Sequence, residues 1–512
     1  MLVKVFGAAV QGIDAFVITI EVSTSRGIKF FLVGLPDVAV RESHERIVSA
    51  LQVNGYKFPT SQIIVNMAPA DIRKEGAAYD LPLAVGIMTG AEIIKPNHLT
   101  EYIIMGELSL DGGLQPIKGA LSMAIKAKEA GFKGVILPYQ NAAEAAVVDG
   151  IEVYGVKNLR QVVSLLNDMP DAIAPMPHYL EKEEDYTGFM GCDFSDIKGQ
   201  EAVKRALEVA AAGGHNIIMI GPPGSGKSMM ARTLPTILPP LTLSESLETT
   251  RIHSVAGYTG QGISLVKNRP FRHPHHTISS IALTGGGINA QPGEISLAHN
   301  GILFLDELPH FSRSALEVLR QPLEDRNIVI ARAKYTVEYP ASFMLVASMN
   351  PCPCGYYNHP TKACQCSPTG IERYLNKISG PLMDRFDLHC EIQPVSFEDM
   401  SSKSKGEPSE KIRARVIRTR EIQSRRFADE KGIYCNAQMD SKLLNLYAKA
   451  EPASINILGQ AMKRLNLSAR AYDRILKVSR TIADMDNSES IKPQHIAEAI
   501  SYRSLDRENW GS

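Results

Sequence analysis

A glycine-rich segment, GPPGSGKS, has the residue types and spacing of a site that binds phosphate. The glycines let backbone N–H groups turn inward around phosphate oxygens, Lys227 can reach the β and γ phosphates, and the Ser228 hydroxyl can bind Mg²⁺. An apolar run at 217–220 precedes the segment and a helical pattern follows it, so a helix N-terminus adds positive potential. The predicted nucleotide site consists of Gly221, Pro222, Pro223, Gly224, Ser225, Gly226, Lys227 and Ser228.

Two later apolar runs end in side chains that could complete this chemistry. Asp306 and Glu307 follow the run ILFL, and Asn350 follows the run SFMLVASM. At the C-terminal edge of a parallel sheet, Asp306 can hold the magnesium ion and Glu307 can polarise the attacking water. Asn350 could orient that water or sense the γ-phosphate; the alternative is a polar residue that only ends its strand.

Arg385 lies between Asp384 and Asp387 in the otherwise apolar segment SGPLMDRFDLH. Phosphoryl transfer builds negative charge on the γ-phosphoryl oxygens, and a guanidinium placed there stabilises the transition state. The alternative is an ion pair within the chain, between Arg385 and either Asp384 or Asp387. Arg470, in the helical segment LNLSARAYDRIL, is a second candidate cation.

The composition limits the classes of protein to which the chain can belong. Its 512 residues exceed what one hydrophobic core supports, which favours two or three domains. The 55 basic and 55 acidic residues balance, so net charge argues neither for nor against nucleic acid. No apolar run reaches the length of a membrane span, and the seven cysteines do not resemble a secreted disulfide framework. We therefore expect a cytoplasmic protein that does not act at a membrane.

The coarse pattern predicts an α/β protein with three domains. Short apolar runs alternate with helical periods over residues 1–168 and again over 192–396, which carries the motifs described above. A linker rich in proline and acidic residues covers 169–191, and a polar linker covers 397–410. From 411 to 512 the pattern is helical, which predicts a lid of helices.

In five motifs the chain resembles the magnesium-chelatase-like AAA+ ATPases: GPPGSGKS, GILFLDE, SMN, GPLMDRFDLH and LSARAYDRILKVSRTIADM. Four more stretches make it similar to the bacterial competence protein M branch, the YifB/ComM family. These are FRHPHHTISSIALTGGG, PGEISLAHNG, LRQPLEDRNIVIARA and NPCPCGYY. The resemblance covers essentially the whole chain, including an AAA+ core over the second α/β region.

This resemblance implies ATP and Mg²⁺ as cofactors and a hexameric ring of identical subunits with ATP at the subunit interfaces. Arg385 would then be a finger that acts on the neighbouring subunit's ATP, and Arg470 a second sensor that couples the lid to the nucleotide. The implied activity is a DNA motor with helicase-like activity. It would drive branch migration of recombination intermediates during uptake and integration of transforming DNA, on branched or single-stranded DNA of any sequence.

The N-terminal region resembles the protease domain of Lon, a ribosomal S5 domain 2-like fold, in NMAPADIRKEGAAYDLPLAVGI and GELSLDGGLQPIKGALSMAIKAKEAGFKGVILPYQN. Ala78 stands where the Lon pattern has its nucleophilic serine, and Leu121 where it has its lysine base. Lys118 lies three residues before the second position. Because this hydrolysis needs both a hydroxyl nucleophile and an amine base, we expect no protease activity. We expect instead a module that binds DNA or shapes the ring.

Four cysteines in the segment CPCGYYNHPTKACQC form two C-x-C pairs. Cys352, Cys354, Cys364 and Cys366 could close a tetrahedral zinc site and fix this loop beside Asn350. Four thiolates leave no open position on zinc, which favours a structural role. The usual spacing is C-x-x-C, so a redox-labile loop or plain buried thiols remain alternatives.

A cluster of histidines, His273, His275 and His276, lies in the segment RHPHHT. The spacing is not helical and no acidic ligand is close in the sequence, so a metal site is disfavoured. We expect a loop near the ring pore or the subunit interface.

Two basic stretches could contact DNA phosphates without reading sequence. The first is a hairpin over RNIVIARAKYTVEYP with Arg326, Arg332 and Lys334, which would point into the pore; the alternative is an exposed hairpin with routine charges. The second is the helix over 411–426, whose arginines are spread around its axis. A solvated connecting helix is the preferred interpretation there.

Two other functions compete with the DNA motor. One is a chelatase motor that inserts magnesium into a porphyrin through a partner subunit, against which we count the Lon-like N-terminal region. The other is a regulatory scaffold that uses nucleotide only as a switch, against which we count the complete set of catalytic residue types.

Overall fold

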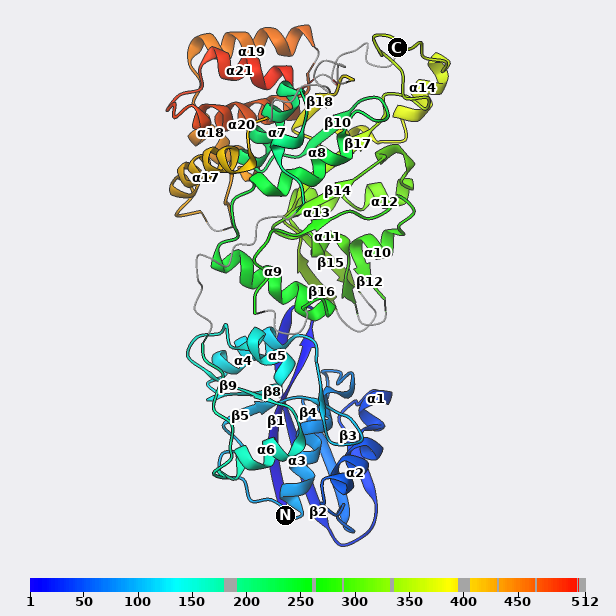
Figure 1. Cartoon of the computed structure of the whole chain (residues 1–512), viewed down its shortest axis with the longest axis vertical. Helices are drawn as coiled ribbons and strands as arrows, with labels where there is room; N and C mark the ends of the chain where they lie inside the picture. The colour runs from blue at the N-terminus through cyan, green and yellow to red at the C-terminus, as the bar shows by residue number, and fades with distance from the viewer. Residues whose placement is uncertain are drawn as a thin grey trace.

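The computed structural model describes residues 1–178, 191–259, 264–287, 290–331, 336–394, 406–430, 432–465, 467–503 and 505. The chain is elongated: residues 1–178 form one end of its longest axis, and residues 406–505 lie beside the far half of residues 191–394 at the other end (Figure 1). We refer to residues 1–178 as the N-terminal part, 191–394 as the middle part and 406–505 as the C-terminal part. No helix among the described residues is both long enough and apolar enough to cross a membrane.

The N-terminal part is built on a seven-stranded mixed sheet in the order β3-β4-β2-β1-β5-β8-β9. The long hairpin of β1 and β2 turns at Gly12, whose φ of 64° suits glycine. β4 runs antiparallel to β2, and the pairs β3–β4, β1–β5, β5–β8 and β8–β9 are parallel. The strands are β1 Leu2–Gln11, β2 Asp14–Ser25, β3 Phe30–Val33, β4 Gln62–Ala68, β5 Tyr102–Ile104, β8 Gly134–Pro138 and β9 Glu152–Val156; β6 Glu107–Leu108 and β7 Leu114–Gln115 form a small separate ladder.

Helices and the sheet share one hydrophobic core in the N-terminal part. The stretch DVAVRESHERIVSALQVNG is helical, although the helix is divided at Glu42. It begins where Asp37 accepts a hydrogen bond from the Val40 N–H at 2.8 Å, and it ends before Gly55, whose φ is 83°. The helices are α1 Val38–Arg41, α2 Ser43–Val53, α3 Asp80–Gly90, α4 Ala120–Glu129, α5 Tyr139–Ala145 and α6 Leu159–Leu166.

The middle part contains a five-stranded parallel sheet in the order β11-β14-β17-β10-β18. Its strands are almost wholly apolar because both faces are covered, as is usual for parallel sheets. Alternate residues of β10, β14 and β17 enter two different cores, one on each side of the sheet. The strands are β10 Ile217–Ile220, β11 Phe271–Arg272, β14 Ile302–Leu305, β17 Met344–Met349 and β18 Leu388–Glu391.

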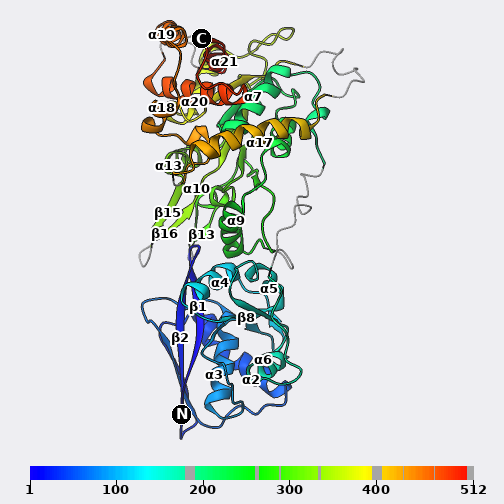
Figure 2. The ribbon, with the colours of Figure 1, turned by 90° about the vertical axis from the view of Figure 1, so that its left-hand side faces the viewer.

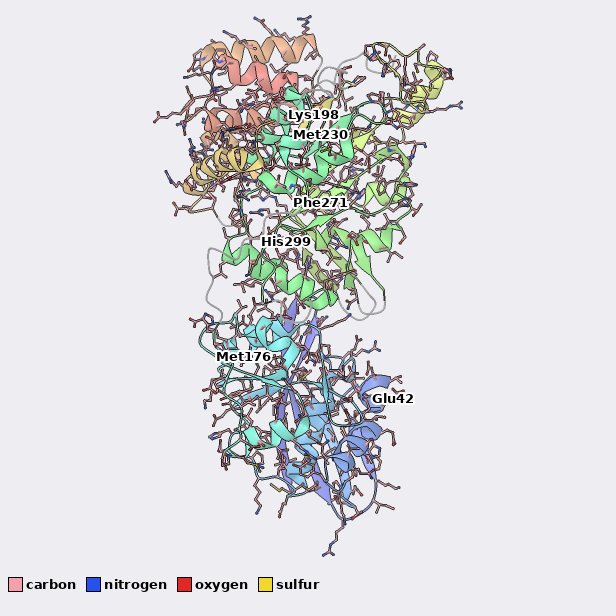
Figure 3. All side chains as sticks on the ribbon, in the orientation of Figure 1. Glu42, Met176, Lys198, Met230, Phe271 and His299 are labelled. Atoms are coloured by element: carbon pink, nitrogen blue, oxygen red, sulfur yellow. The ribbon has the colours of Figure 1, made fainter. Side chains whose placement is uncertain are left out.

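One of the two cores joins the sheet to the C-terminal part, and it includes Met230 of α8 and Phe271 of β11 (Figure 3). The other core holds the sheet against the β15–β16 hairpin and short helices. The remaining elements of the middle part are α7 Glu201–Gly213, α8 Lys227–Thr233, α9 Leu243–Ala256, α10 Ser280–Thr284, α11 Glu294–Leu297, α12 Arg313–Glu317, α13 Arg320–Asp325, β15 Asn327–Ala331, β16 Thr336–Pro340, α14 Pro368–Leu375 and α15 Gly380–Met383. In addition, β12 Gly285–Gly286 pairs with β13 Gln291–Pro292.

The C-terminal part is helical over its described residues, as the sequence predicts. The long helix α17 lies along α7, where Arg415 Nε donates to Glu208 Oε1 at 2.6 Å and Gln423 Nε2 donates to the Ala212 carbonyl at 3.0 Å. These bonds fix the helical part to the sheet. The helices are α17 Ser409–Arg426, α18 Ser441–Tyr447, α19 Pro452–Arg464, α20 Ala469–Met485 and α21 Pro493–Ser501.

The N-terminal part contacts the middle part through the tip of the β1–β2 hairpin and through α4, which lies near α9 (Figure 2). Ile13 at the tip packs against the core beside β16, and Arg251 of α9 donates to Asp14 Oδ1 at 2.7 Å. Deeper in the contact, the Gly119 N–H donates to Ser254 Oγ at 3.0 Å.

The α/β fold class, with a parallel sheet in the middle and helices at the C-terminus, is confirmed. Both predicted linkers lie largely outside the described residues, because 179–190 and 395–405 are not described.

Candidate nucleotide site

The phosphate loop lies between β10 and α8, at the C-terminal edge of the parallel sheet. Gly224 and Gly226 have φ values of 78° and 88°, a region that side chains rarely adopt, so the loop needs glycine there. Gly221 is required for a different reason, since a Cβ on it would come within 2.6 Å of the Ile392 carbonyl oxygen. The loop therefore opens directly into the N-terminus of α8.

Lys227 closes the inner side of this loop. Its Nζ donates to the carbonyls of Gly221 at 2.8 Å and Pro222 at 2.9 Å, and to Asn350 Oδ1 at 3.2 Å. Burial lowers the pKa of the Lys227 ammonium, and the charges of Asp306 and Glu307 partly offset that effect. The lysine, the end of β17 and the two carboxylates thus share one small volume.

Asp306 connects the phosphate loop to two neighbouring strands. Ser228 Oγ donates to Asp306 Oδ2 at 2.6 Å, and Ser348 Oγ of β17 donates to Asp306 Oδ1. The contact follows from the parallel register, which places Leu305 opposite Ala347. The role of Ser348 was not predicted; a single polar residue inside the apolar run MLVASM was its signal in the sequence.

The site's chemistry fits a magnesium nucleotide. The Ser228 hydroxyl and the Asp306 carboxylate are the oxygen ligands that Mg²⁺ prefers. Ser225 Oγ is buried in the loop and has no hydrogen-bond partner within the part of the chain that the structure describes. A buried hydroxyl without a partner is costly, and a phosphate oxygen at this loop would satisfy it.

The carboxylate of Glu307 has different partners from that of Asp306. The Glu307 φ of 55° is left-handed, its N–H donates to Asp306 Oδ1 at 3.0 Å, and its Oε2 lies 3.2 Å from Nδ1 of His310. Of the histidine cluster, His276 Nδ1 lies 3.7 Å from the same oxygen, and His273 stacks on Phe304 at 4.8 Å. The histidine loop therefore lies beside the strand that ends in Asp306 and Glu307.

Arg385 lies at the N-terminal ends of the parallel strands, whereas its own phosphate loop lies at their C-terminal ends. Its carbonyl accepts from Asn216 Nδ2 at 3.0 Å, and Asn216 precedes β10 while Gly221 follows it. At about 3.3 Å per strand residue, the five steps from Asn216 to Gly221 span about 16 Å. This backbone position does not place the arginine beside the phosphate loop of its own chain.

The alternative for Arg385 was an ion pair within the chain, and the structure has one, but with Glu324 and not with Asp384 or Asp387. Its guanidinium pairs with Glu324 of α13, and its Nε is buried without a partner among the described residues. Asp387 instead pairs with Arg474, and Asp384 with Arg470.

Arg470, in the first turn of α20, lies close to these same strand ends. Its Nη1 is 3.5 Å from Asp384 Oδ2, and 62% of its side chain is exposed. Arg385, Arg470 and Arg474 line one cavity of about 580 Å³ between the middle and C-terminal parts, and residues 221–228 are not among its lining. The structure thus brings the two predicted arginines together and keeps both away from Lys227.

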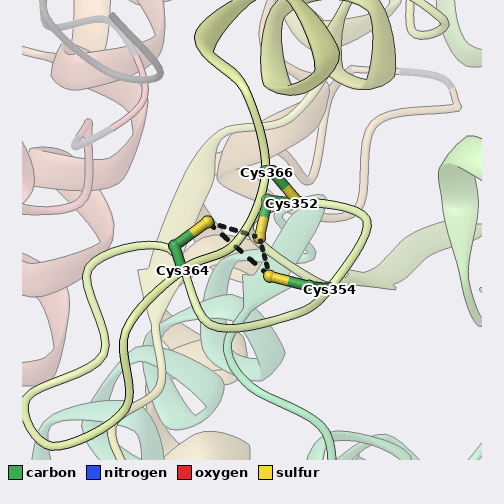
Figure 4. A group of neighbouring side chains, drawn as sticks. All are labelled: Cys352, Cys354, Cys364 and Cys366. Atoms are coloured by element: carbon green, nitrogen blue, oxygen red, sulfur yellow. Dashed lines mark hydrogen bonds between the residues drawn. The ribbon is translucent and has the colours of Figure 1, made fainter.

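The four cysteines converge in the loop between β17 and α14 (Figure 4). The Sγ of Cys352 lies 3.3 Å from that of Cys354 and 3.7 Å from that of Cys364, and all four sulfurs lie within 4.8 Å of one another. Tetrahedral zinc with Zn–S bonds of about 2.3 Å separates sulfurs by about 3.8 Å, so the cluster is compatible with zinc. Among the described residues this is the one cluster of metal-ligating side chains that close together.

This cysteine loop lies directly on the phosphate loop. A Cβ on Gly355 would come within 2.6 Å of Pro223 Cδ, so the two loops are already in van der Waals contact. Gly355 also has a φ of 85°, which favours glycine independently.

The basic stretches are used mainly inside the chain. Arg326 donates to the carbonyls of Gln438 at 2.7 Å and Gly432 at 3.3 Å, so its guanidinium is engaged within the chain, which disfavours the predicted DNA contact by this residue. Arg332 and Lys334 lie outside the described residues. In α17, Arg420 donates to the Ala211 carbonyl at 3.0 Å and Arg426 to Asp484 Oδ2 at 2.6 Å, which makes this helix a packed element more than a solvated one.

The positions that match the Lon catalytic pair lack the chemistry in the structure as well. Ala78 lies beside a cavity of about 920 Å³ between the N-terminal and middle parts, and Leu121 is fully buried in α4. Lys118 also lines that cavity, with its Cε close to Gly257 at the end of α9. No hydroxyl stands at position 78 and no amine at position 121.

Comparison with known proteins identifies each part of the chain. The family described as magnesium chelatase, subunit ChlI, matches residues 193–400. The family described as subunit ChlI of Mg-chelatase matches 20–141, and the family for the C-terminal region of this subunit matches 406–503. The chain is also 31% identical to Lon protease 2 of Bacillus subtilis over 143 residues, which is 28% of this chain and 25% of that protein.

Full-length relatives define the branch of this family. Competence protein ComM of Haemophilus influenzae is 42% identical over 508 residues, covering 99% of this chain and 98% of that protein. The protein YifB of Escherichia coli is 42% identical over 504 residues, covering 98% of this chain and 96% of that protein. These matches confirm the family resemblance seen in the motifs. The chain therefore belongs to the ComM/YifB branch of the magnesium-chelatase-like AAA+ ATPases.

Proposed function

We propose that the protein is an ATP-hydrolysing ring motor that acts on DNA. It would promote branch migration and unwinding of recombination intermediates during DNA uptake and homologous recombination. One observation carries the motor assignment: Arg385 lies about 16 Å of strand away from its own phosphate loop, at the opposite ends of the parallel strands. A guanidinium in that position suits the nucleotide of a second copy of the chain, as in a ring. The name of the H. influenzae relative supports the link to DNA uptake.

The proposed roles of the site residues follow from their contacts. The loop from Gly221 to Ser228 would bind the phosphates, with Lys227 moving from the loop carbonyls to the β and γ phosphates. Ser228 and Asp306 would hold Mg²⁺, which neutralises charge on the phosphates when bound. Glu307 would activate the attacking water, and Asn350, already 3.2 Å from the Lys227 ammonium, would orient it.

We assign Arg385 and Arg470 together to the neighbouring subunit's site. Both line one cavity, and Arg470 contacts Asp384, the residue before Arg385. In this arrangement the second sensor acts across the interface beside the finger. Six subunits per ring is the number that the family implies, and the ring is part of this proposal.

Three further parts of the sequence hypothesis belong to the same proposal. They are the division of the chain at 168–169, 191–192, 396–397 and 410–411, a cytoplasmic location, and a structural zinc ion held by the four cysteines. The converging sulfurs support the zinc ion.

A chelatase motor remains the second candidate, because all three matching families are described by the ChlI subunit of magnesium chelatase. Because a ChlI family of magnesium chelatase also matches residues 20–141, the N-terminal region no longer counts against a chelatase. The full-length relatives favour the DNA motor instead. Stimulation of ATP hydrolysis by forked or single-stranded DNA is expected of the DNA motor and not of the chelatase motor.

Branch migration of a synthetic junction with ATP tests the proposal. We expect the wild-type protein to convert the junction into duplex products, and the Lys227→Ala variant to leave it intact because the phosphates lose their ammonium contact. Multiple-turnover phosphate release in the same reactions separates a motor from a nucleotide-switched scaffold. A protein that hydrolyses ATP, is not stimulated by DNA and moves no junction would contradict the DNA assignment.

A further inference from the structure

The carboxylate of Glu307 is held by one of its two oxygens. Oε2 lies 3.2 Å from His310 Nδ1 and 3.7 Å from His276 Nδ1. Oε1 has no hydrogen-bond partner within the described part of the chain. Such a division leaves one oxygen free for a water molecule while the other is restrained.

Both imidazoles are themselves held in place by neighbouring rings. His310 packs edge-to-face against Tyr374 of α14, with centroids 6.4 Å apart and an interplanar angle of 81°. His276 stacks on His275 at 4.1 Å and meets Phe311 edge-on at 6.4 Å. Packing of this kind limits the orientations that each imidazole can adopt.

The backbone of Glu307 contributes to the same orientation. Its left-handed φ of 55° is uncommon for a residue with a side chain, and its N–H is bonded to Asp306 Oδ1. The first part of the side chain is therefore directed by the strand end, and its carboxylate by the histidines. The other carboxylate oxygen, Oε1, therefore remains available to accept a hydrogen bond from a water molecule.

We propose that His310 and His276 are positioning residues that hold Oε2 of Glu307 so that Oε1 faces the attacking water. This inference rests on the proposed role of Glu307 as the group that activates water. Neither histidine needs to touch ATP. Their contribution is to keep the carboxylate in one orientation when the water is ready to react, which removes unproductive orientations from the reactive state.

The central experiment measures ATP hydrolysis by the assembled protein, without DNA, for three variants. His310→Ala removes the donor to Oε2, and we expect kcat to fall about 10-fold with the KM for ATP unchanged, because orientation and not binding is lost. His310→Asn keeps an N–H near the Nδ1 position and should recover most of that loss. His276→Ala, at the longer distance, should have a smaller effect in the same direction.

His98→Ala is the matched control, since His98 Nδ1 lies 2.8 Å from Glu101 Oε1, three residues apart like His310 and Glu307, but in the N-terminal part and away from the nucleotide site. It should hydrolyse ATP at the wild-type rate. A kcat for His310→Ala equal to or above the wild-type value would overturn the proposal, as would an Asn variant no better than the Ala variant. If His310→Ala does not fold, His310→Asn and His276→Ala still decide the question.

A double-mutant cycle tests whether His310 acts through Glu307. We expect Glu307→Gln to bind ATP and hydrolyse it on the order of 100-fold more slowly, and His310→Ala to add no further loss in that background. Equal losses in both backgrounds would remove His310 from the positioning of Glu307. Because these measurements use ATP alone, failure of the DNA assignment would leave them unaffected and is seen separately in the junction assay.

Discussion

Asp306 and Glu307 are neighbours in the sequence, but their carboxylates meet different partners. Asp306 continues the direction of β14 and accepts from Ser228 and Ser348. The left-handed φ of Glu307 turns the next side chain toward His310. One change in backbone direction therefore separates a group suited to hold a magnesium ion from a group suited to activate water. Two chemical tasks need two distinct environments, and a single strand end supplies both.

Zinc in the cysteine cluster leads to a prediction about single side chains. Purified wild-type protein should contain about one zinc ion per chain, and Cys364→Ser should lose it, because three thiolates and a hydroxyl bind zinc less well. Metal content by mass spectrometry checks this. Cys192→Ser is the control, since Cys192 lies outside the cluster and near the Arg232 carbonyl. Wild-type protein without zinc, prepared without chelators, would argue for the alternative of a redox-labile loop.

The same mutation should also affect the nucleotide site, because Gly355 of the cysteine loop contacts Pro223 of the phosphate loop. We expect weaker ATP binding in Cys364→Ser and not in Cys192→Ser. ATP affinity measured by titration distinguishes this coupling from a zinc ion that only stabilises its own loop.

The sequence was sufficient to predict contacts between two segments that lie at the same end of the parallel strands. The contact of Ser228 with Asp306 follows from a phosphate loop and a strand that end at the same edge. The partner of Arg385 could not be found this way. Asp384 and Asp387 flank it in the sequence, but Glu324 approaches from a helix 61 residues earlier, and only the packed fold brings that helix close.

Strand β10 joins the two proposed halves of the nucleotide chemistry. Asn216, immediately before it, donates to Asp387 Oδ2 at 3.0 Å and to the Arg385 carbonyl, and accepts from the Leu345 N–H at 2.8 Å. The other end of β10 becomes the phosphate loop. In the proposed ring, a displacement of the Arg385 segment by a neighbouring subunit would reach the buried strand β10 through Asn216, and β10 ends at the chain's own phosphate loop.

The β15–β16 hairpin gives a prediction about an element. Burial lowers the pKa of the Arg326 guanidinium, which donates to two carbonyls of the C-terminal part. Arg326→Ala should lower the free energy of unfolding by about 1–3 kcal/mol, because these carbonyls lose their donors. Chemical denaturation measures this, with the exposed Arg313→Ala on α12 as control.

The same variant, Arg326→Ala, also tests whether Arg326 contacts DNA. If Arg326 contacted DNA phosphates, Arg326→Ala would reduce the slope of the logarithm of the DNA-binding constant against the logarithm of the salt concentration by about one. The free energy of unfolding would then be unchanged. We expect the slope to be unchanged, since the side chain is used within the fold.

Element types were predictable because the periodicities in this chain are strong, from the apolar run before the phosphate loop to the helices after residue 411. The packing of α17 against its neighbours could not be predicted from the sequence. Its arginines are spread around the axis, which suggested exposure, but Arg415, Arg420 and Arg426 each find carboxylates or carbonyls on α7 or α20. Long arginine side chains can cover an interface and still satisfy their charge, and the sequence of one helix does not show this.

The whole chain is held together by buried polar contacts between its parts. Glu144 of the N-terminal part accepts from Ser254 of α9 and from the Leu121 N–H at 2.9 Å. Burial raises the pKa of the Glu144 carboxyl, and these hydrogen bonds partly offset the effect. Leu121, at the position of the Lon base, therefore helps to fix a domain contact.

The proposed ring would account for the position of the arginines and the phosphate loop at opposite ends of the parallel strands. Heterologous contacts between identical subunits place one surface of each copy against a different surface of the next, and they form a ring where the rotation between copies closes. Each complete site would then take Lys227 from one subunit and Arg385 from its neighbour. Neither Lys227→Ala nor Arg385→Ala protein should hydrolyse ATP alone.

Mixing these two inactive proteins tests the shared site directly. In a random 1:1 assembly, about a quarter of the interfaces pair an intact phosphate loop with an intact Arg385, so about a quarter of wild-type ATP hydrolysis should return. The double variant Lys227→Ala/Arg385→Ala, mixed with either single variant, is the control and should restore nothing, because no interface then has both groups. Native mass spectrometry establishes that the subunits exchange. Co-assembled subunits that regain no activity would place Arg385 outside the neighbour's site, and activity of Arg385→Ala protein alone would do the same.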